Sequence, residues 1–477
     1  MSLKAQAISG MLWTYSQQFG IQLIQFGVSI VLARLITPEE FGLIGMIAVF
    51  MGIGTTLFDG GLTSSLIRTS SVEDIDYSTV FLFNFGVSIL IYAVFFVTAP
   101  FIANFFGQPV LTSIIRVYSL SFVISSLAAV QNAKLTKELK FKLLAIASFP
   151  GAILSGLVGI LLAYNGYGVW ALVYSFLVQS AATTLVLWLL SGWRPSLQFS
   201  RQKFREHFFF GSKLTLSGLL DVIFTNIYQL VIGKMYAPAQ VGYYTRANTL
   251  MMLPVGNIST ALNKVVFPLF SKLQDDLPKL RDAYRRIMLA VIFLVSPVIV
   301  IMAVLAKPLI LFLFGAKWEA VVPIFQIIAV TGILYPLHLY NLLILQVRGK
   351  SGLFLKLEIA KKILMIALLS ISLFFGFDGL LWGMVIFSIL ALFINTFYAG
   401  QELRYPAIQQ FRDVIPIFLL STSMGVIIYY LAMVLYSFGN FVPLAVGSVV
   451  GLLFYLAVGR ICKLESMSEL INLINKR

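Results

Sequence analysis

Long apolar stretches follow one another along almost the whole of this sequence, separated by short polar connections. A helix needs roughly 20 mostly apolar residues to cross the hydrocarbon core of a bilayer. About fourteen stretches meet that requirement. They predict an all-α integral membrane protein, because a helix satisfies all its backbone groups within one segment. The predicted spans are 11–34, 41–58, 78–105, 111–131, 143–164, 168–191, 209–233, 246–270, 287–314, 321–346, 355–375, 379–400, 414–437 and 440–460.

The composition excludes the soluble classes of protein. Hydrophobic residues make up 59% of the chain and charged residues only 11%, whereas an average soluble domain is about 25% charged. The chain has one cysteine, Cys462, and two histidines, His207 and His338. These numbers give no basis for an internal disulfide framework or a histidine-rich metal site. We therefore expect no metal and no other cofactor.

The placement of the basic residues predicts the orientation in the membrane. The net charge is +15, and the chain has 34 Lys and Arg. If the amino terminus is cytoplasmic, most of them fall in cytoplasmic connections. The opposite side receives only Arg34, Lys234, Arg246, Lys307 and Lys317. This asymmetry is the positive-inside pattern. It predicts that both termini are cytoplasmic and that the basic loops face membrane lipids rather than nucleic acid.

An internal repeat predicts how the spans are organised. The segments VLARLITPEEFG at 31–42 and VIGKMYAPAQVG at 231–242 align without gaps, and each has a proline followed four residues later by glycine. Six spans separate the copies, an even number, so both copies cross the membrane in the same sense. We predict two parallel six-helix lobes, 1–195 and 196–400, with two extra helices and a cytoplasmic tail in 401–477. Two such lobes can alternate access to a central cavity.

Polar side chains that recur on one helix face predict the wall of this cavity, because polar groups inside a membrane usually face a bundle interior. Gln18, Gln22 and Gln25 share a face of the first span, at spacings of three and four residues. Hydrogen bonds between helices are the alternative role for this glutamine stripe. Amide, hydroxyl and aromatic groups of this kind suit a sugar. The other polar candidates for the cavity are Asn84, Asn257 and Tyr335.

Basic and titratable groups within the spans are candidates for an anionic substrate and for ion coupling. Arg116, Arg246 and Lys264 suit a phosphate or pyrophosphate group. Arg116 and Arg246 have a second interpretation, in which each extends to the membrane interface. Asp221 is a candidate coupling-ion site or an ion-pair partner for a cavity base. His338 is either a proton relay or a histidine held by packing contacts.

The motifs that the chain lacks weaken an enzymatic interpretation. The sequence contains no Gly-rich phosphate-binding loop of the Walker type. The predicted connections on both sides of the membrane are short and carry no paired carboxylates or nucleophile motif. A membrane-embedded glycan polymerase or ligase is the alternative from the enzyme class.

Several segments resemble a known family. They are LARLITPEEFG at 32–42, FDGGLTSSLIR at 58–68, GYGVWAL at 166–172, IGKMYAPAQVGYYTR at 232–246 and FPLFSKLQDD at 267–276. Together they make the chain similar to the polysaccharide transport family of the MOP (MATE-like) superfamily, the Wzx-type flippases. The resemblance is strongest to the branch that includes the colanic acid and teichuronic acid exporters, and it covers nearly the whole chain.

The resemblance implies two six-helix lobes in a V around a cationic cavity, in a bacterial cytoplasmic membrane. It implies flipping of undecaprenyl-pyrophosphate-linked oligosaccharide to the periplasmic leaflet for capsule, exopolysaccharide or O-antigen synthesis, driven by a gradient of H+ or Na+. A polysaccharide polymerase and glycosyltransferases are further partners that it suggests. A multidrug or lipid II transporter of the same fold is the alternative cargo class.

Overall fold

Helices form all the regular structure in the described part of the chain. The computed structural model describes the backbone of residues 3–467, and their side chains apart from 3–12, 15 and 260–265. The chain divides into two compact units, Met1–Gly242 and Tyr243–Arg477. The all-α membrane class predicted from the sequence is confirmed.

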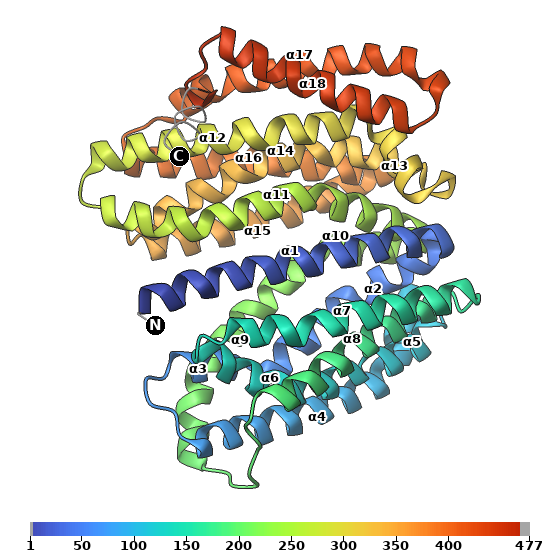
Figure 1. Cartoon of the computed structure of the whole chain (residues 1–477), viewed down its shortest axis with the longest axis vertical. Helices are drawn as coiled ribbons and strands as arrows, with labels where there is room; N and C mark the ends of the chain where they lie inside the picture. Colours follow the sequence, from blue (N-terminus) through green and yellow to red (C-terminus); the bar gives the residue numbers. More distant parts are fainter. Residues whose placement is uncertain (1–2, 468–477) are drawn as a thin grey trace. The chain divides into compact units, whose positions relative to one another are not determined.

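The first unit contains ten helices in its described residues, and an eleventh begins close to its end. Within the unit α7 packs along α8 and α1, and α6 packs between α4 and α8 (Figure 1). The helices are α1 (Leu3–Leu35), α2 (Pro38–Asp59), α3 (Leu62–Arg68), α4 (Asp74–Phe106), α5 (Leu111–Tyr118), α6 (Leu120–Lys137), α7 (Phe141–Tyr164), α8 (Val169–Leu190), α9 (Arg201–Thr225) and α10 (Ile227–Met235). Next, α11 (Pro238–Leu273) runs into the second unit.

In the second unit α14 packs against α16 and α12, and α17 packs against α18 and α12. The remaining helices are α12 (Leu277–Val304), α13 (Ala306–Phe314), α14 (Val321–Val347), α15 (Ser351–Ser372), α16 (Gly376–Leu403), α17 (Ala407–Leu435) and α18 (Phe441–Ile461), with short 3-10 turns η1 (Ala316–Trp318), η2 (Leu373–Phe375) and η3 (Tyr436–Phe438).

Twelve helical stretches of the described residues are long and apolar enough to cross a membrane. One of them, Ser351–Leu403, contains both α15 and α16. The twelve do not include α11 (36 residues), in which the side chains of 260–265 lie outside the described part of the chain. The count of fourteen spans therefore stays a prediction.

Three predicted spans are each divided into two helices. The span 111–131 is interrupted between α5 and α6, 209–233 between α9 and α10, and 287–314 between α12 and α13. At the second interruption, Asn226 ends α9, and its side-chain amide donates to the carbonyl oxygen of Val222 at 2.8 Å. Such a side chain competes with the backbone for hydrogen bonds, which apolar periodicity alone does not reveal.

The helix packing groups α9 and α10 with the first unit, since α9 contacts α2, α3 and α4. The predicted lobes instead divide at 195/196, between the two copies of the repeat. A repeat boundary and a packing boundary are different properties of a chain, so the predicted lobes stay a prediction.

The two repeated turns contact each other within the first unit. A Cβ atom added to Gly42 would lie 1.8 Å from the carbonyl oxygen of Pro238, and one added to Gly242 would lie 2.1 Å from that of Pro38. The contact is thus reciprocal, as expected for two copies related by a local two-fold axis. It needs glycine in both copies, because any side chain would overlap the backbone of the other copy.

We expect Gly42→Ala to destabilise the protein by roughly 1–3 kcal/mol, because the new methyl group overlaps the Pro238 carbonyl. The matched control is Gly86→Ala in α4, where an added Cβ has no neighbour within 4 Å. Alanine is also more favourable than glycine in the interior of a helix, so the control substitution should not destabilise α4. Thermal unfolding of the purified variants measures the difference, and equal melting temperatures for the two variants would contradict the close contact.

Candidate functional site: a polar hollow in the first unit

A hollow with a volume of about 730 Å³ lies among α2, α3, α6, α8 and α9 of the first unit. Its size is typical of small-molecule sites, which span about 300–1,000 Å³. We call it the polar hollow, because hydroxyl and amide groups make up much of its lining. The lining residues are Thr55, Thr56, Phe58, Asp59, Gly61, Thr63, Ser64, Ile67, Ser125, Ala128, Ala129, Asn132, Ala133, Phe176, Gln179, Ser180, Thr183, Thr184, Leu187, Leu214 and Thr215.

A break between α2 and α3 shapes one wall of the polar hollow. Gly60 and Gly61 have positive φ angles of 55° and 65°, a conformation that glycine adopts without steric cost. The chain therefore leaves α2 after Asp59 and starts α3 at Leu62. This turn places Asp59 and Thr63 on the same wall, where the Thr63 hydroxyl donates to Asp59 Oδ1 at 2.6 Å.

Close backbone packing brings α9 against this turn. A Cβ atom added to Gly211 would lie 2.4 Å from the carbonyl oxygen of Gly60, and one added to Gly61 would lie 2.6 Å from that of Gly211. Thr215 follows Gly211 by one helical turn and lines the polar hollow. Glycine on both sides of the contact thus allows α9 to complete the wall.

Hydrogen bonds between helices fix α8 on the other side. The Thr184 hydroxyl donates to the carbonyl oxygen of Ile124 at 3.1 Å, and Trp188 Nε1 donates to that of Leu127 at 2.7 Å. Both acceptors belong to α6. The polar side chains of Gln179, Ser180 and Thr183 then line the polar hollow from α8.

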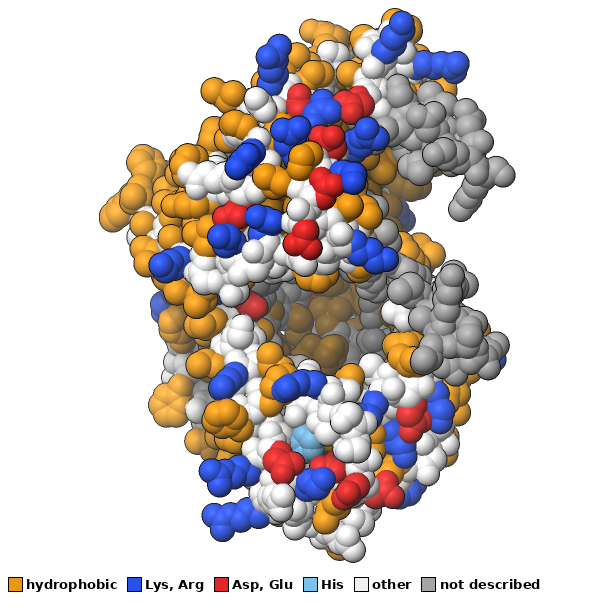
Figure 2. All heavy atoms as spheres, turned by 90° about the vertical axis from the view of Figure 1, so that its left-hand side faces the viewer, with side chains coloured by type: hydrophobic (Ala, Val, Ile, Leu, Met, Phe, Trp, Pro, Cys, Tyr) orange, Lys and Arg blue, Asp and Glu red, His pale blue; other side chains and the backbone are white. Residues whose placement is uncertain are grey.

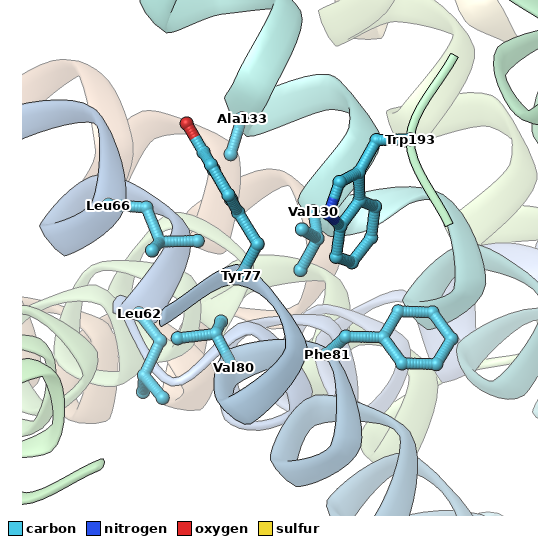
Figure 3. Close-up of a cluster of buried hydrophobic side chains, with 8 residues drawn as sticks. All are labelled: Leu62, Leu66, Tyr77, Val80, Phe81, Val130, Ala133 and Trp193. Atoms are coloured by element: carbon cyan, nitrogen blue, oxygen red, sulfur yellow. The ribbon is translucent and has the colours of Figure 1, made fainter. Parts of the chain in front are cut away.

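An apolar cluster anchors α3 and the start of α4 beside the polar hollow. Figure 3 shows the side chains of α3, α4 and α6 converging with Trp193, from the segment after α8. Full burial of a Val, Leu or Phe side chain away from water stabilises a fold by about 1.5–3 kcal/mol. The cluster consists of Leu62, Leu66, Tyr77, Val80, Phe81, Val130, Ala133 and Trp193.

A buried polar cluster joins α3, α4 and α9, and we call it the Asp76 cluster. Its members are Ser65, Asp76, Lys203 and His207. His207 Nδ1 lies 2.8 Å from the Ser65 hydroxyl, and its Nε2 lies 3.1 Å from Asp76 Oδ1. Lys203 Nζ lies 3.2 Å from Asp76 Oδ2. Asp76 is 1% exposed, and these contacts compensate the cost of burying its charge.

Charged side chains of both signs lie at the surface of each unit. Figure 2 shows Lys and Arg mixed with Asp and Glu on both units. In the second unit, Arg285 Nη1 lies 2.6 Å from Glu465 Oε2, and Arg285 also pairs with Asp413. Burial, followed by the hydrogen bond to Asp413, raises the pKa of the Tyr405 hydroxyl in that unit.

The predicted site residues of the first unit lie outside the polar hollow. Gln18 and Gln25 are exposed on α1, Gln22 is half-buried, and Asp221 is exposed on α9. Asn84 lies inside the helix packing. It is fully buried on α4, and neither its amide nitrogen nor its oxygen has a partner among the described residues.

Arg116 makes local contacts. Its Nε donates to the carbonyl oxygen of Phe96 at 3.1 Å, and its guanidinium lies 4.3 Å from the centre of the Phe96 ring. This is a packing contact with α4 of the kind that a long cationic side chain makes with an aromatic face.

In the second unit, the predicted residues lie on α11 and α14. Arg246 is 8% exposed, with its guanidinium 5.0 Å from the Phe314 ring centre and 5.1 Å from that of Trp318. The Asn257 amide donates to the carbonyl oxygen of Leu253 at 2.7 Å. The side chain of Lys264 lies outside the described residues.

The hydrogen-bond partners of His338 on α14 are neutral. Its Nε2 lies 3.1 Å from the Ser388 hydroxyl, and its Nδ1 lies 3.2 Å from Asn395 Nδ2. Tyr335, also on α14, is 37% exposed. The substrate and coupling roles suggested for all these residues stay predictions.

The residues that line the polar hollow are ones that the sequence analysis did not select. Nine of the 21 are Thr or Ser, which look nearly neutral in a hydropathy profile, and the lining is divided among five helices. One signal was present: the segment 55–64 contains four Thr and Ser around Asp59 and a glycine pair, within an otherwise apolar region. Glycine pairs next to hydroxyl residues indicate a helix break, and such breaks occur in membranes where they are buried in protein or line a cavity.

Comparison with known proteins agrees with this fold. The model of a family described as "Polysaccharide biosynthesis protein" matches residues 31–323. The lipopolysaccharide biosynthesis protein WzxC of Escherichia coli is 27% identical over 343 residues, which cover 70% of this chain and 68% of that protein. The teichuronic acid biosynthesis protein TuaB of Bacillus subtilis is 24% identical over 436 residues, covering 90% and 89%.

Among solved structures, the lipid II flippase MurJ in an inward closed conformation superposes with a TM-score of 0.77 at 18% identity, covering 95% of this chain and 99% of that one. A MATE-family multidrug transporter of the MOP superfamily superposes with a TM-score of 0.64 at 19% identity, covering 80% and 94%. At these identities the superpositions establish the fold alone.

We expect removal of either His207 or Asp76 to lower the stability by about 1–3 kcal/mol, because each leaves buried polar partners unsatisfied. The His207→Ala and Asp76→Ala losses should not add in the double variant, since the two side chains share one contact. Midpoints of SDS denaturation for the wild-type protein, the two single variants and the double variant would measure this double-mutant cycle. The control is Lys140→Ala, which breaks the exposed pair with Glu138 and should change the stability by less than about 1 kcal/mol. Additive losses would show that the Asp76 cluster is not a unit.

Proposed function

Because the chain belongs to the polysaccharide biosynthesis protein family, we propose that it is a flippase for undecaprenyl-pyrophosphate-linked oligosaccharide. The observation that carries the proposal is the family match, which runs from α1 through the first unit and into α14 of the second. The cargo class is consistent with the names of the two relatives, which assign them to lipopolysaccharide and teichuronic acid synthesis.

The direction of transport is from the cytoplasmic to the outer leaflet of a bacterial cytoplasmic membrane, and both termini are cytoplasmic. The asymmetry of the basic residues supports this orientation. Such a protein moves its cargo by alternating access, with the energy supplied by a gradient of H+ or Na+. Membrane lipids surround the chain, and a polymerase and glycosyltransferases are the partners of such a transporter.

The chemistry of the polar hollow supports a glycan cargo over a drug cargo. Hydroxyl and amide groups of Thr55, Asn132 and Gln179 can exchange hydrogen bonds with sugar hydroxyls. Phe176, stacked on Tyr118 at 4.6 Å between ring centres, adds an aromatic face for the apolar side of a sugar ring. An apolar organic cation would leave most of these polar groups without a partner.

Flipping in proteoliposomes tests the proposal directly. We expect undecaprenyl-pyrophosphate oligosaccharide to become accessible to a glycan-modifying enzyme outside the vesicle, faster with an imposed proton or sodium gradient than without one. The gradient that accelerates the reaction identifies the coupling ion, and protein-free vesicles are the control. Transport of a cationic dye without movement of glycan would favour a multidrug transporter. A lengthened glycan chain would favour a polymerase.

A further inference from the structure

The charge of the polar hollow differs from that of the molecule as a whole. The chain has a net charge of +15. Of the described residues that line the hollow, Asp59 is the only one that carries a charge, and none is Lys or Arg. The hollow therefore presents an uncharged polar surface with one carboxylate, whereas a site for an anionic group would be expected to present cations.

Three basic side chains of the neighbouring helices are held by other groups. Arg68 of α3 lies with its guanidinium 4.4 Å from the centre of the Phe210 ring. Lys213 of α9 lies 4.4 Å from the centre of the Phe209 ring. Lys137 of α6 donates to the carbonyl oxygen of Leu66 at 3.1 Å. None of these three is an ion-pair partner of Asp59, whose carboxylate accepts from the Thr63 hydroxyl and the Gly61 backbone N–H.

Three threonines of the wall use their hydroxyl donors within their own helices. The hydroxyls of Thr55, Thr56 and Thr215 donate to the backbone carbonyl oxygens four residues earlier, at 2.9, 2.9 and 3.0 Å. A hydroxyl has one donor and two acceptor positions. These side chains therefore offer mainly acceptors to a ligand, as the Asp59 carboxylate also does.

The single carboxylate, together with the lack of Lys and Arg in the lining, distinguishes between classes of sugar. A neutral sugar can donate to the threonine oxygens and the carboxylate, and it can accept from amides such as those of Asn132 and Gln179. A uronic acid or a phosphorylated sugar brings an ionised group that would meet the like charge of Asp59 with no lining cation to offset it. Like-charge juxtaposition is costly in a partly desolvated site.

We propose that the polar hollow binds an uncharged, polyhydroxylated part of the cargo and excludes sugars that carry a carboxylate or phosphate, with Asp59 as the residue that enforces this selectivity. The inference rests on the proposed function only for identifying the ligand as a glycan. It deepens that function by naming the charge class of the sugar taken by this unit.

Cysteine protection tests the proposal without requiring transport. The chain has one cysteine, the exposed Cys462, so Cys462→Ser provides a cysteine-free background. Ser180→Cys then places a single thiol in the wall of the hollow, and the rate of its reaction with a maleimide reports occupancy. The full chain is reconstituted in lipid nanodiscs. The two probes are maltotriose, which is neutral, and trigalacturonate, which has the same number of rings and three carboxylates.

We expect maltotriose at about twice its Kd to slow the labelling about threefold, since only the empty fraction of the protein reacts. Trigalacturonate at the same concentration should slow it less than about 1.2-fold, which corresponds to binding at least about tenfold weaker. In the Asp59→Asn variant, trigalacturonate should slow the labelling of the thiol more than it does when Asp59 is present. The control is Ser437→Cys, which places a thiol at an exposed position in the middle of η3. This thiol should react at one rate in all conditions.

Thr56→Val is a second variant that keeps the charge and the shape of the wall. It should weaken the protection of the thiol by maltotriose, and trigalacturonate should still have no effect on the labelling rate. The proposal therefore stays testable even if Asp59→Asn misfolds. Equal protection by both probes, or protection by neither, would overturn the inference. Flipping of lipid-linked glycan together with either of those results would leave the proposed flippase function standing. Selective protection without any flipping would instead overturn the transport function.

Discussion

Backbone hydrogen bonding in lipid is the constraint on which this structure depends, because an unpaired peptide group cannot be tolerated in the hydrocarbon core. Continuous helices satisfy it, and each interruption must be covered by other parts of the protein. The break at Gly60 and Gly61, which directly follows the span Pro38–Asp59, is covered by α9, which approaches through Gly211. That same interruption places Asp59 and Thr63 on a cavity wall. The candidate site is thus a by-product of how one helix break is packed.

The features governed by periodicity and hydropathy could be predicted from the sequence. The all-helical membrane fold follows from long apolar segments. The repeated turns at Pro38 and Pro238 were visible as an ungapped alignment, and their reciprocal packing through Gly42 and Gly242 fits a pair of equivalent elements. Interruptions such as the one at Asn226 were not predicted, since they depend on a side chain that ends a helix locally while the apolar pattern continues.

The candidate site was harder to predict, because the strongest polar signals in a membrane sequence need not line a cavity. Arg116 contacts Phe96, Arg246 lies between Phe314 and Trp318, and His338 bonds to Ser388 and Asn395. Each of these large polar groups has neighbours within its own unit. Many of the polar groups of the hollow are instead Thr and Ser. The hydroxyls of Thr55, Thr56 and Thr215 bond to the preceding helical turn, so they cost little in an apolar helix. Their assembly depends on which helices meet, which one sequence does not specify.

The reciprocal contact between the repeated turns also limits how the gene that encodes this chain can change. Gly42 occupies the space beside Pro238, and Gly242 occupies the space beside Pro38. After a duplication, most positions in two copies are free to diverge, because each copy meets different neighbours. Here each copy is the neighbour of the other, and a larger residue in either one would have to be accommodated by a backbone shift in both. We therefore expect the two turns to have drifted least from their common ancestor, long after the surrounding helices lost their likeness.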